Sequence, residues 1–220
     1  MKRALILGAS GGIGGAVVEN LNEQRWDVIS LSRSLNQFDV TDEDSVKAAF
    51  TSFDGPFDFI LIATGALEIN SAPEKSINHL LQRNMIDHFR TNAIGPALIL
   101  KHIRLFLDKT SPSVISVLSA RVGSIEDNEL GGWYSYRAAK AAVNQIVKSF
   151  SIELARSHPK ACLLAIHPGT VDTKLTQKYA SNYPTKTPKE AAQNLLDVTL
   201  NKDPSHTGRF YDWADEEIPW

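Results

Sequence analysis

A glycine-rich segment near the start of the chain, residues 8–14 (GASGGIG), constrains the fold more than any other feature. It directly follows the apolar run Ala4–Leu7 and leads into a helical pattern over about Ile13–Gln24. A strand, a glycine turn and a helix in this order are typical of the phosphate-binding start of a dinucleotide-binding fold. Glycines also serve ordinary turns, so the strand–turn–helix context is what favours a nucleotide site.

Each glycine in this turn has its own physical reason. Gly8 allows the tight turn, Gly12 lets the backbone approach a pyrophosphate, and Gly14 lets the helix pack on the strand. The first turn of the helix then presents free N–H groups and the positive end of the helix dipole to the phosphates. The residues expected to hold the cofactor phosphates are Gly8, Ser10, Gly11, Gly12, Ile13 and Gly14.

Beyond this unit, short apolar runs alternate with helical patterns, as in a parallel sheet built from βαβ units. Further strands are predicted at Val28–Leu31, Phe38–Val40, Phe57–Ala63, Val114–Ser119, Ala161–Ile166 and Gly208–Tyr211. Further helices are predicted from a capping box at Thr41 and Asp44 through Phe50, and over Ile77–Arg90, Ala93–Leu107, Tyr134–Arg156 and Pro188–Leu200.

Uninterrupted apolar strands of this kind belong in a sheet that is covered on both faces. We therefore predict a single α/β domain over residues 1–220, a Rossmann-like, doubly wound parallel β-sheet in three α/β/α layers. Residues 1–110 form its cofactor half, and residues 111–220 form its catalytic and substrate half.

Composition excludes several classes of function. The net charge is −2, so no electrostatic argument favours nucleic acid or an anionic membrane. The apolar run after Met1 ends at the glycines, too early for a signal peptide or a membrane span. The single cysteine, Cys162, lies in an apolar run without a ligand cluster, so a buried strand thiol is expected. We expect no metal, and a cytoplasmic location.

The end of the second strand discriminates between the two nicotinamide dinucleotides. An acidic residue there would hydrogen-bond the ribose hydroxyls of NAD. This chain has Ser32-Arg33 instead, and a guanidinium pairs with a 2′-phosphate, which a carboxylate would repel. The pair favours NADP(H) over NAD(H); a solvated loop arginine is the alternative.

The most informative stretch for chemistry is Tyr136-Arg-Ala-Ala-Lys140. Residues four apart share one face of a helix, so a phenol and an ammonium can meet in one pocket. Reduction of a carbonyl by hydride needs a proton donor, and a nearby ammonium is expected to lower the pKa of the tyrosine. An exposed helix pair is the alternative. Tyr134 is a decoy, because Ala138 stands four residues after it.

Together, the Gly-x-x-x-Gly-x-Gly turn and the Tyr-x-x-x-Lys pair make the chain resemble the short-chain dehydrogenase/reductase family. The segments at Gly123–Ile125, Gly131–Arg137 and Gly208–Trp220 resemble its C-factor and sniffer-type carbonyl reductase branch. The resemblance implies an NADP(H)-dependent oxidoreductase acting on a carbonyl or alcohol, with Tyr136 as general acid/base. Lys140 would orient the ribose. Gly11 departs from the pattern, because many NADP-preferring members carry a basic residue there.

The resemblance implies two further catalytic members. Asn92 matches an asparagine at a helix kink that holds a water near the lysine, and Gly95-Pro96 supports an irregular helix there. A simple helix cap is the alternative. The family serine is missing, because Ala120 stands at its position. Ser119 is our candidate to replace it, which requires the backbone to shift or bulge; Ser124 is a remoter one.

The resemblance also extends the cofactor site beyond the glycine turn. Asp39 and Val40 match a pair that touches adenine, and Ala63, Thr64 and Gly65 would pass beside the ribose. A third set would contact the nicotinamide. It consists of Pro168, Gly169, Val171 and Thr173. The first two segments could equally be ordinary strand ends, and the Pro168-Gly169 turn needs little functional explanation by itself. His167 is assigned no role.

The sequence does not name the substrate. The polar loop Lys174–Thr187 contains Lys174, Gln177 and Lys178, which meet a polar substrate or are simply solvated. The tryptophans at 133, 213 and 220 line a pocket or pack the C-terminal tail. A homodimer is expected through the helices that carry Asn92 and Lys140, using the face Ala138, Ala141, Ala142 and Ile146. The alternative function is an NADP(H)-binding regulatory or signalling protein with little turnover.

Overall fold

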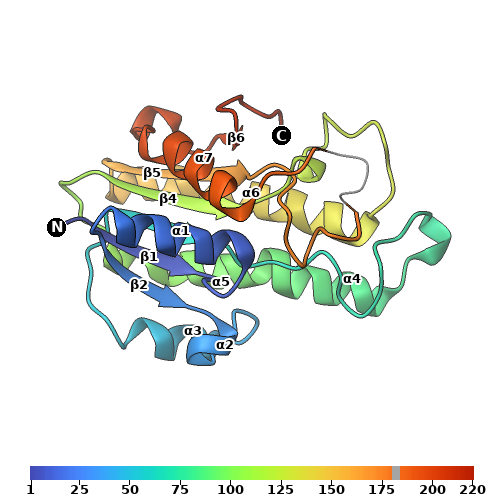
Figure 1. Cartoon of the computed structure of the whole chain (residues 1–220), viewed down its shortest axis with the longest axis horizontal. Helices are drawn as coiled ribbons and strands as arrows, with labels where there is room; N and C mark the ends of the chain where they lie inside the picture. Colours follow the sequence, from blue (N-terminus) through green and yellow to red (C-terminus); the bar gives the residue numbers. More distant parts are fainter. Residues whose placement is uncertain (180–183) are drawn as a thin grey trace.

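In the part of the chain that the structure describes, six parallel strands form one sheet in the order β2-β1-β3-β4-β5-β6 (Figure 1). The structure is a computed structural model, and it describes residues 1–179 and 184–220. The strands are β1 (Arg3–Leu7), β2 (Asp27–Leu31), β3 (Phe59–Ile62), β4 (Ser113–Leu118), β5 (Ala161–His167) and β6 (Phe210–Asp212). This order confirms the doubly wound α/β fold class.

Helices cover both faces of the sheet, as predicted. The α-helices are α1 (Gly12–Glu23), α2 (Arg33–Asn36), α3 (Glu43–Phe50), α4 (Gln82–Phe89), α5 (Gly95–Ile103), α6 (Tyr134–Ser157) and α7 (Pro188–Leu200). Short 3-10 turns lie at Ile77–His79, Arg104–Phe106, Arg121–Gly123 and Pro204–His206. None of the helices in residues 1–179 and 184–220 is long and apolar enough to cross a bilayer.

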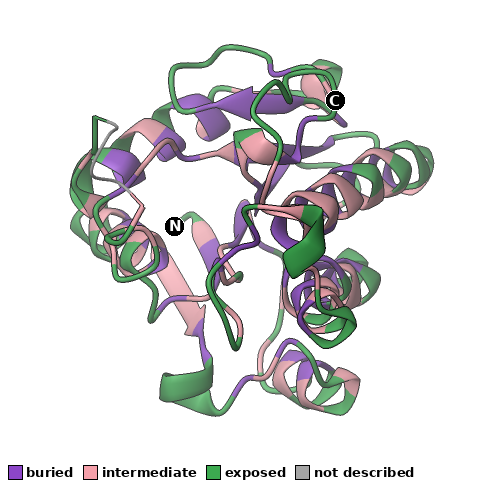
Figure 2. Cartoon of the chain, turned by 90° about the vertical axis from the view of Figure 1, so that its right-hand side faces the viewer, coloured by how far each residue is buried: buried purple, intermediate pink, exposed green. Residues whose placement is uncertain are grey.

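Two apolar clusters, one on each face, hold the three layers together. α1 and α7 pack on one face through side chains such as Leu21 and Leu195. α3, α5 and α6 pack on the other through side chains such as Ile99 and Val147. Successive strand residues serve opposite faces, and Figure 2 shows the inner strands buried, the edge strand β2 mostly half-buried and the outer helix surfaces exposed. This burial on both sides explains the uninterrupted apolar strands.

The strand predicted at Phe38–Val40 is wrong. These residues are irregular, and the amide of Asp39 donates to the Ser45 hydroxyl rather than to a strand. A parallel neighbour for β2 would need a crossover of about a dozen residues. Only the four-residue helix α2 stands in between. Phe38 and Val40 are buried because they pack into the core beneath α3 and α5.

The caps of α3 and α7 are set by local side chains. Asp42, not Thr41, caps α3, accepting a bond from the Asp44 amide, so the predicted capping box is wrong. The Thr41 hydroxyl instead donates to Asp39. Helix α7 begins at Pro188 as predicted, with a capping box between Thr187 and Glu190.

The irregular helix predicted around Gly95-Pro96 is confirmed. A π-helical turn, Arg90–Ile94, joins α4 to α5, and the Gly95 amide donates to the carbonyl of Arg90. Pro96 has no N–H, so it cannot bond the carbonyl of Asn92 four residues earlier, and the helix widens here. The widened turn directs Asn92 into the interior, where it is fully buried.

Candidate active site

The expected site residues gather at the carboxyl ends of the strands, on the right in Figure 1. The glycine turn follows β1, residues 63–65 follow β3, and Pro168 follows β5. The start of α6 lies at the same edge, beside the segment that follows β4. Ligands of open α/β sheets bind at this edge, where the helix N-termini and the loops converge.

The glycine turn has the geometry expected of it. Gly8 has a φ of +95°, and its amide donates to the carbonyl of Leu31 at 2.8 Å. A Cβ on Gly14 would lie 2.3 Å from the Gly8 carbonyl oxygen, so this glycine lets the helix pack on the turn. Gly11 caps α1 without a side-chain bond from any described residue, so the first N–H groups are free for an anion.

Gly12 and Thr173, far apart in the sequence, meet at this turn. A Cβ on Gly12 would lie 2.6 Å from the Cγ2 atom of Thr173. The segment after β5 therefore closes over the glycine turn. This brings the residues expected at the two ends of the cofactor, phosphate and nicotinamide, to one place.

Beside the end of β2, Arg33 is accessible. Ser32 is buried and caps α2 by accepting a bond from the Leu35 amide. The Arg33 side chain is 71% exposed, and its guanidinium lies 3.7 Å from the Asp39 carboxylate. Hydrogen bonds from Thr41, and the Arg33 charge, hold the pKa of Asp39 below its usual value. Arg33 is thus free to turn toward a ligand at this edge.

Tyr136, Lys140 and Asn92 come together, all buried. The Lys140 Nζ atom donates to the carbonyl of Leu118 at 2.9 Å and lies 5.8 Å from the centre of the Tyr136 ring. A Cβ on Gly65 would lie 3.0 Å from the Asn92 Oδ1 atom and 3.4 Å from Lys140 Nζ. The strand end after β3 therefore needs glycine to fit between these two side chains.

Burial sets the protonation of the pair. It raises the pKa of Tyr136 above its ordinary value, and it lowers the pKa of Lys140 to about 8. In this structure burial acts against the predicted lowering of the tyrosine pKa, because loss of water disfavours the phenolate. Tyr136 is a protonated donor at neutral pH.

Ser119 has another partner. Its hydroxyl donates to the Oδ1 atom of Asn144 on α6 at 2.6 Å, and its amide bonds the carbonyl of Ile166 as a regular strand residue would. The backbone shift that would free Ser119 is therefore not seen. Ser124 is buried and accepts a bond from the Asp127 amide. Ala120 leaves the position of the family serine without a hydroxyl.

Glu74 is a residue that the sequence analysis missed. Its carboxylate accepts bonds from the amide and the hydroxyl of Ser135, and its carbonyl accepts the amide of Trp133 at 2.5 Å. Glu74 thereby caps α6, the helix that carries Tyr136. The contact spans 61 positions, so no local sequence signal could have revealed it.

The ring of Trp133 packs beside the ring of Tyr136. Trp133 follows Gly131 and Gly132, and all three residues have positive φ values. Its ring lies 6.3 Å from the Tyr136 ring and 5.4 Å from that of Tyr179, edge to face. Two further tryptophans considered for a pocket pack elsewhere: Trp213 lies against Gly169 and Lys186, and Trp220 stacks on Phe210.

The loop after β5 is tied across the site by Glu68. Its carboxylate pairs with Lys178 at 2.8 Å and accepts the hydroxyl of Tyr179. Lys178 is thus paired with a carboxylate in this structure, although its side chain is 72% exposed. The next part of the predicted substrate loop, residues 180–183, lies outside the described residues.

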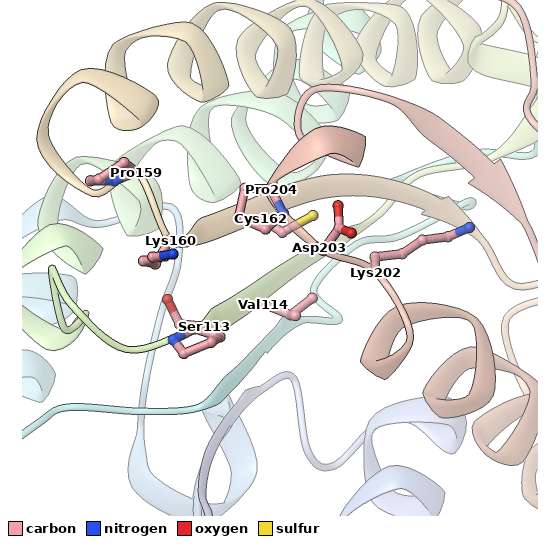
Figure 3. A pocket seen from close by; sticks show the side chains of 9 residues that line it. Ser113, Val114, Pro159, Lys160, Cys162, Lys202, Asp203 and Pro204 are labelled. Atoms are coloured by element: carbon pink, nitrogen blue, oxygen red, sulfur yellow. The ribbon is translucent and has the colours of Figure 1, made fainter.

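The pocket in Figure 3 lies at the opposite, amino-terminal ends of β4 and β5. Ser113, Lys160, Cys162 and Asp203 line it. Burial raises the pKa of the Cys162 thiol to about 12, so the cysteine is an inert strand residue as expected. Among the described residues, no group of His, Cys, Asp and Glu side chains is arranged to hold a metal ion.

Known proteins are similar to this chain over most of its length. A family model described as short chain dehydrogenase matches residues 34–184. The chain is also 30% identical over 235 residues to 1-hydroxy-2-glutathionyl-2-methyl-3-butene dehydrogenase of Rhodococcus sp. (strain AD45), and the match covers 100% of both chains.

The chain belongs to the short-chain dehydrogenase family. This short-chain dehydrogenase is 32% identical over 137 residues to C-signal of Myxococcus xanthus, covering 62% of this chain and 79% of that protein. It resembles the structure of an NADPH-bound carbonyl reductase from chicken fatty liver, with a TM-score of 0.85. That match is 22% identical and covers 100% of this chain and 94% of the other, which shows the fold alone.

Membership makes this short-chain dehydrogenase an oxidoreductase that uses a nicotinamide cofactor. The described residues fit such a group. The start of α1 is open to phosphates, Gly8 and Gly12 keep side chains away from the turn, and Lys140 is held at the carboxyl edge of the sheet.

Proposed function

We propose that this dehydrogenase is an NADP(H)-dependent carbonyl reductase that interconverts a carbonyl and an alcohol with Tyr136 as general acid/base. The observation that carries the proposal is the burial of Tyr136 and Lys140 together on one face of α6, beside Asn92. When bound, the reduced nicotinamide supplies the hydride to the carbonyl carbon. Tyr136 gives its hydroxyl proton to the carbonyl oxygen, so that an alcohol forms.

The geometry gives each member a task. Burial keeps Tyr136 protonated, which suits a donor in the reducing direction. Lys140 sits next to Gly65, where its ammonium orients the ribose and stabilises the tyrosinate left after proton transfer. Asn92 lies at the widened turn and supports a water relay toward Lys140. Ser119 acts as a second donor only after its hydroxyl turns away from Asn144.

NADP(H) is the proposed cofactor. The exposed guanidinium of Arg33 supports this preference, because it reaches a 2′-phosphate without displacing packed groups. The chicken carbonyl reductase with the same fold holds NADPH. Three further sets of residues complete the proposed cofactor site. They are Gly8, Ser10, Gly11, Gly12, Ile13 and Gly14 at the phosphates; Ser32, Asp39, Val40, Ala63, Thr64 and Gly65 along adenosine and ribose; and Pro168, Gly169, Val171 and Thr173 at the nicotinamide.

Turnover tests this function directly. Oxidation of NADPH and of NADH is followed against a panel of aldehydes, ketones and quinones. We expect turnover with at least one carbonyl and a preference for NADPH. Tight NADPH binding without turnover on any carbonyl would refute the reductase and favour the alternative, a cofactor-binding regulator. Ala120, at the position of the family serine, is the observation that favours that alternative; the buried Tyr136–Lys140 pair disfavours it.

The proposed assembly is a homodimer of these chains, in the cytoplasm. The outer faces of α5 and α6 form a shallow groove that is lined by apolar and charged side chains. It is lined by Ala97, Leu100, Lys101, Arg104, Ile146, Phe150 and Glu153. Half-buried Ala138, Ala141 and Ala142 continue the α6 surface. A second copy of the chain would cover this face, and light scattering of the purified protein measures the mass that decides it.

A further inference from the structure

His88 is a buried titratable residue to which the proposed mechanism gives no task. It lies on α4, four residues before Asn92, and is only 3% exposed. Its Nδ1 atom lies 3.2 Å from the Nδ2 atom of Asn92, and its ring meets the edge of Tyr136 at 6.0 Å. His88 therefore touches two members of the candidate site at once.

The hydrogen bonds of Asn92 fix where the proton of His88 lies. The Asn92 Oδ1 atom accepts the amide of Ala66, and its Nδ2 atom donates to the carbonyl of Ala66, both at 2.9 Å. These two bonds fix the orientation of the carboxamide, so an N–H group faces His88. The Nδ1 atom must then accept this bond, and the proton of the neutral ring lies on Nε2.

The same contacts explain what protonation would do. A doubly protonated ring has no acceptor at Nδ1, so it would face the Asn92 N–H group with an N–H of its own. Burial lowers the pKa of His88, while the carboxylates of Glu74 and Asp87 act to raise it. Tyr136 on α6 also faces the His88 ring, and Lys140 lies one turn further along that helix.

We propose that His88, in its neutral form, is a positioning residue that holds Asn92 and the ring of Tyr136 in place, so that protonation of His88 lowers turnover. It links three segments: the loop after β3 through Ala66, the π-helical turn through Asn92, and α6 through Tyr136. The inference rests on the proposed function for its effect on turnover, but not for the position of the proton.

Two substitutions separate the parts of this role. His88→Asn keeps an acceptor at the place of Nδ1 but does not titrate, and His88→Leu fills the space without an acceptor. In the Leu variant kcat/KM for carbonyl reduction is expected to fall about tenfold at neutral pH, because a buried N–H of Asn92 loses its partner. The affinity for NADPH is expected to change less than about twofold, because His88 lies outside the proposed cofactor site.

The pH profile distinguishes positioning from simple packing. In the unsubstituted protein kcat/KM is expected to decline as the pH falls below the ordinary histidine range, and His88→Asn is expected to remove that decline while keeping most of the activity. A Leu variant with full activity, or an Asn variant that keeps the same decline, would overturn the proposal.

A second measurement does not depend on turnover. In histidine-labelled protein, the ¹⁵N shifts of the imidazole report which nitrogen carries the proton, and the spectrum of His88→Asn assigns the His88 signals. A protonated Nε2 and a bare Nδ1 at neutral pH are expected. A proton on Nδ1 overturns the inference whether or not a substrate is found. Absence of turnover with the expected shifts refutes the proposed function alone.

Discussion

At the level of single residues, burial controls the charges on which the proposed chemistry depends. Tyr136 and Lys140 are both enclosed, and loss of water disfavours phenolate and ammonium alike. Tyr136 therefore keeps its proton, whereas Lys140, with a pKa of about 8, is charged only below that pH. The proposed reduction needs both the proton on Tyr136 and the positive charge on Lys140.

This places an alkaline limit on cofactor use. We expect kcat/KM for NADPH to fall as the pH rises through about 8, because the neutral amine of Lys140 no longer attracts the cofactor. This ratio reports groups of the free enzyme, before bound phosphates shift the lysine. The measurement is a pH profile at constant ionic strength. A profile that stays level well above pH 8 would contradict the account.

Arg33 is expected to set the choice between the two cofactors. Replacing it in Arg33→Ala should raise KM for NADPH roughly 10- to 100-fold, the effect of losing a charged hydrogen bond to phosphate. KM for NADH should change little. Lys47→Ala, which removes another exposed cation from nearby α3, is the matched control. Equal losses with both cofactors would show that Arg33 does not read the 2′-phosphate.

His167 is expected to make the fold sensitive to acid. Burial lowers its pKa to about 4, and its Nδ1 atom has no partner among the described residues. Between pH 6.5 and 4, His167 is therefore protonated in the unfolded chain but not in the folded chain. The free energy of unfolding falls as the pH drops through this window. Between pH 7.5 and 5 the loss should be about 2 kcal/mol.

Denaturant unfolding at the two pH values measures this loss. The substitution His167→Asn should reduce it, whereas His79→Asn, at an exposed histidine, should leave it unchanged. An equal loss in the unsubstituted protein and in His167→Asn would assign the acid sensitivity to other groups.

At the level of elements, α6 owes its start to a distant residue. Trp133 stands at the cap position, and its side chain makes no capping bond to the described residues. Glu74 supplies that bond to Ser135 from a loop before α4. A carboxylate also interacts favourably with the positive end of the helix dipole.

Glu74→Gln is therefore expected to lower the free energy of unfolding by about 1–2 kcal/mol. The change keeps the size of the side chain, removes its charge, and replaces one of the two accepting oxygens with an NH2 donor. Glu129→Gln, at an exposed position, is the control. Thermal unfolding checks the effect, and equal melting temperatures for both variants would argue against a cap at Glu74.

Elements with purely local determinants were predictable from the sequence. Helix α7 begins at Pro188 because Thr187 and Glu190 form a capping box within four residues. The strand predicted at Phe38–Val40 was wrong. Alternating apolar residues indicate that side chains are buried, but they do not show that a neighbouring strand is available for pairing. The irregular turn around Asn92 was predictable, since Pro96 removes a backbone donor.

At the scale of the whole molecule, the fold and the main motifs could be predicted because they follow short-range spacing. Tyr136 and Lys140 share a helix face, and the glycine turn follows a strand. Glu74 was not predictable, because only the folded chain brings it to Ser135. His88 left a usable signal, since it stands one helical turn before Asn92.

One measurement tests the central claim most directly: single-turnover reduction of a carbonyl by NADPH in Tyr136→Phe and Tyr134→Phe. The two tyrosines are neighbours at the start of α6, but only Tyr136 lies beside Lys140. We expect Tyr136→Phe to slow the chemical step about 10²- to 10⁴-fold with NADPH still bound, and Tyr134→Phe to have little effect. Equal rates in the two variants would contradict the role of Tyr136.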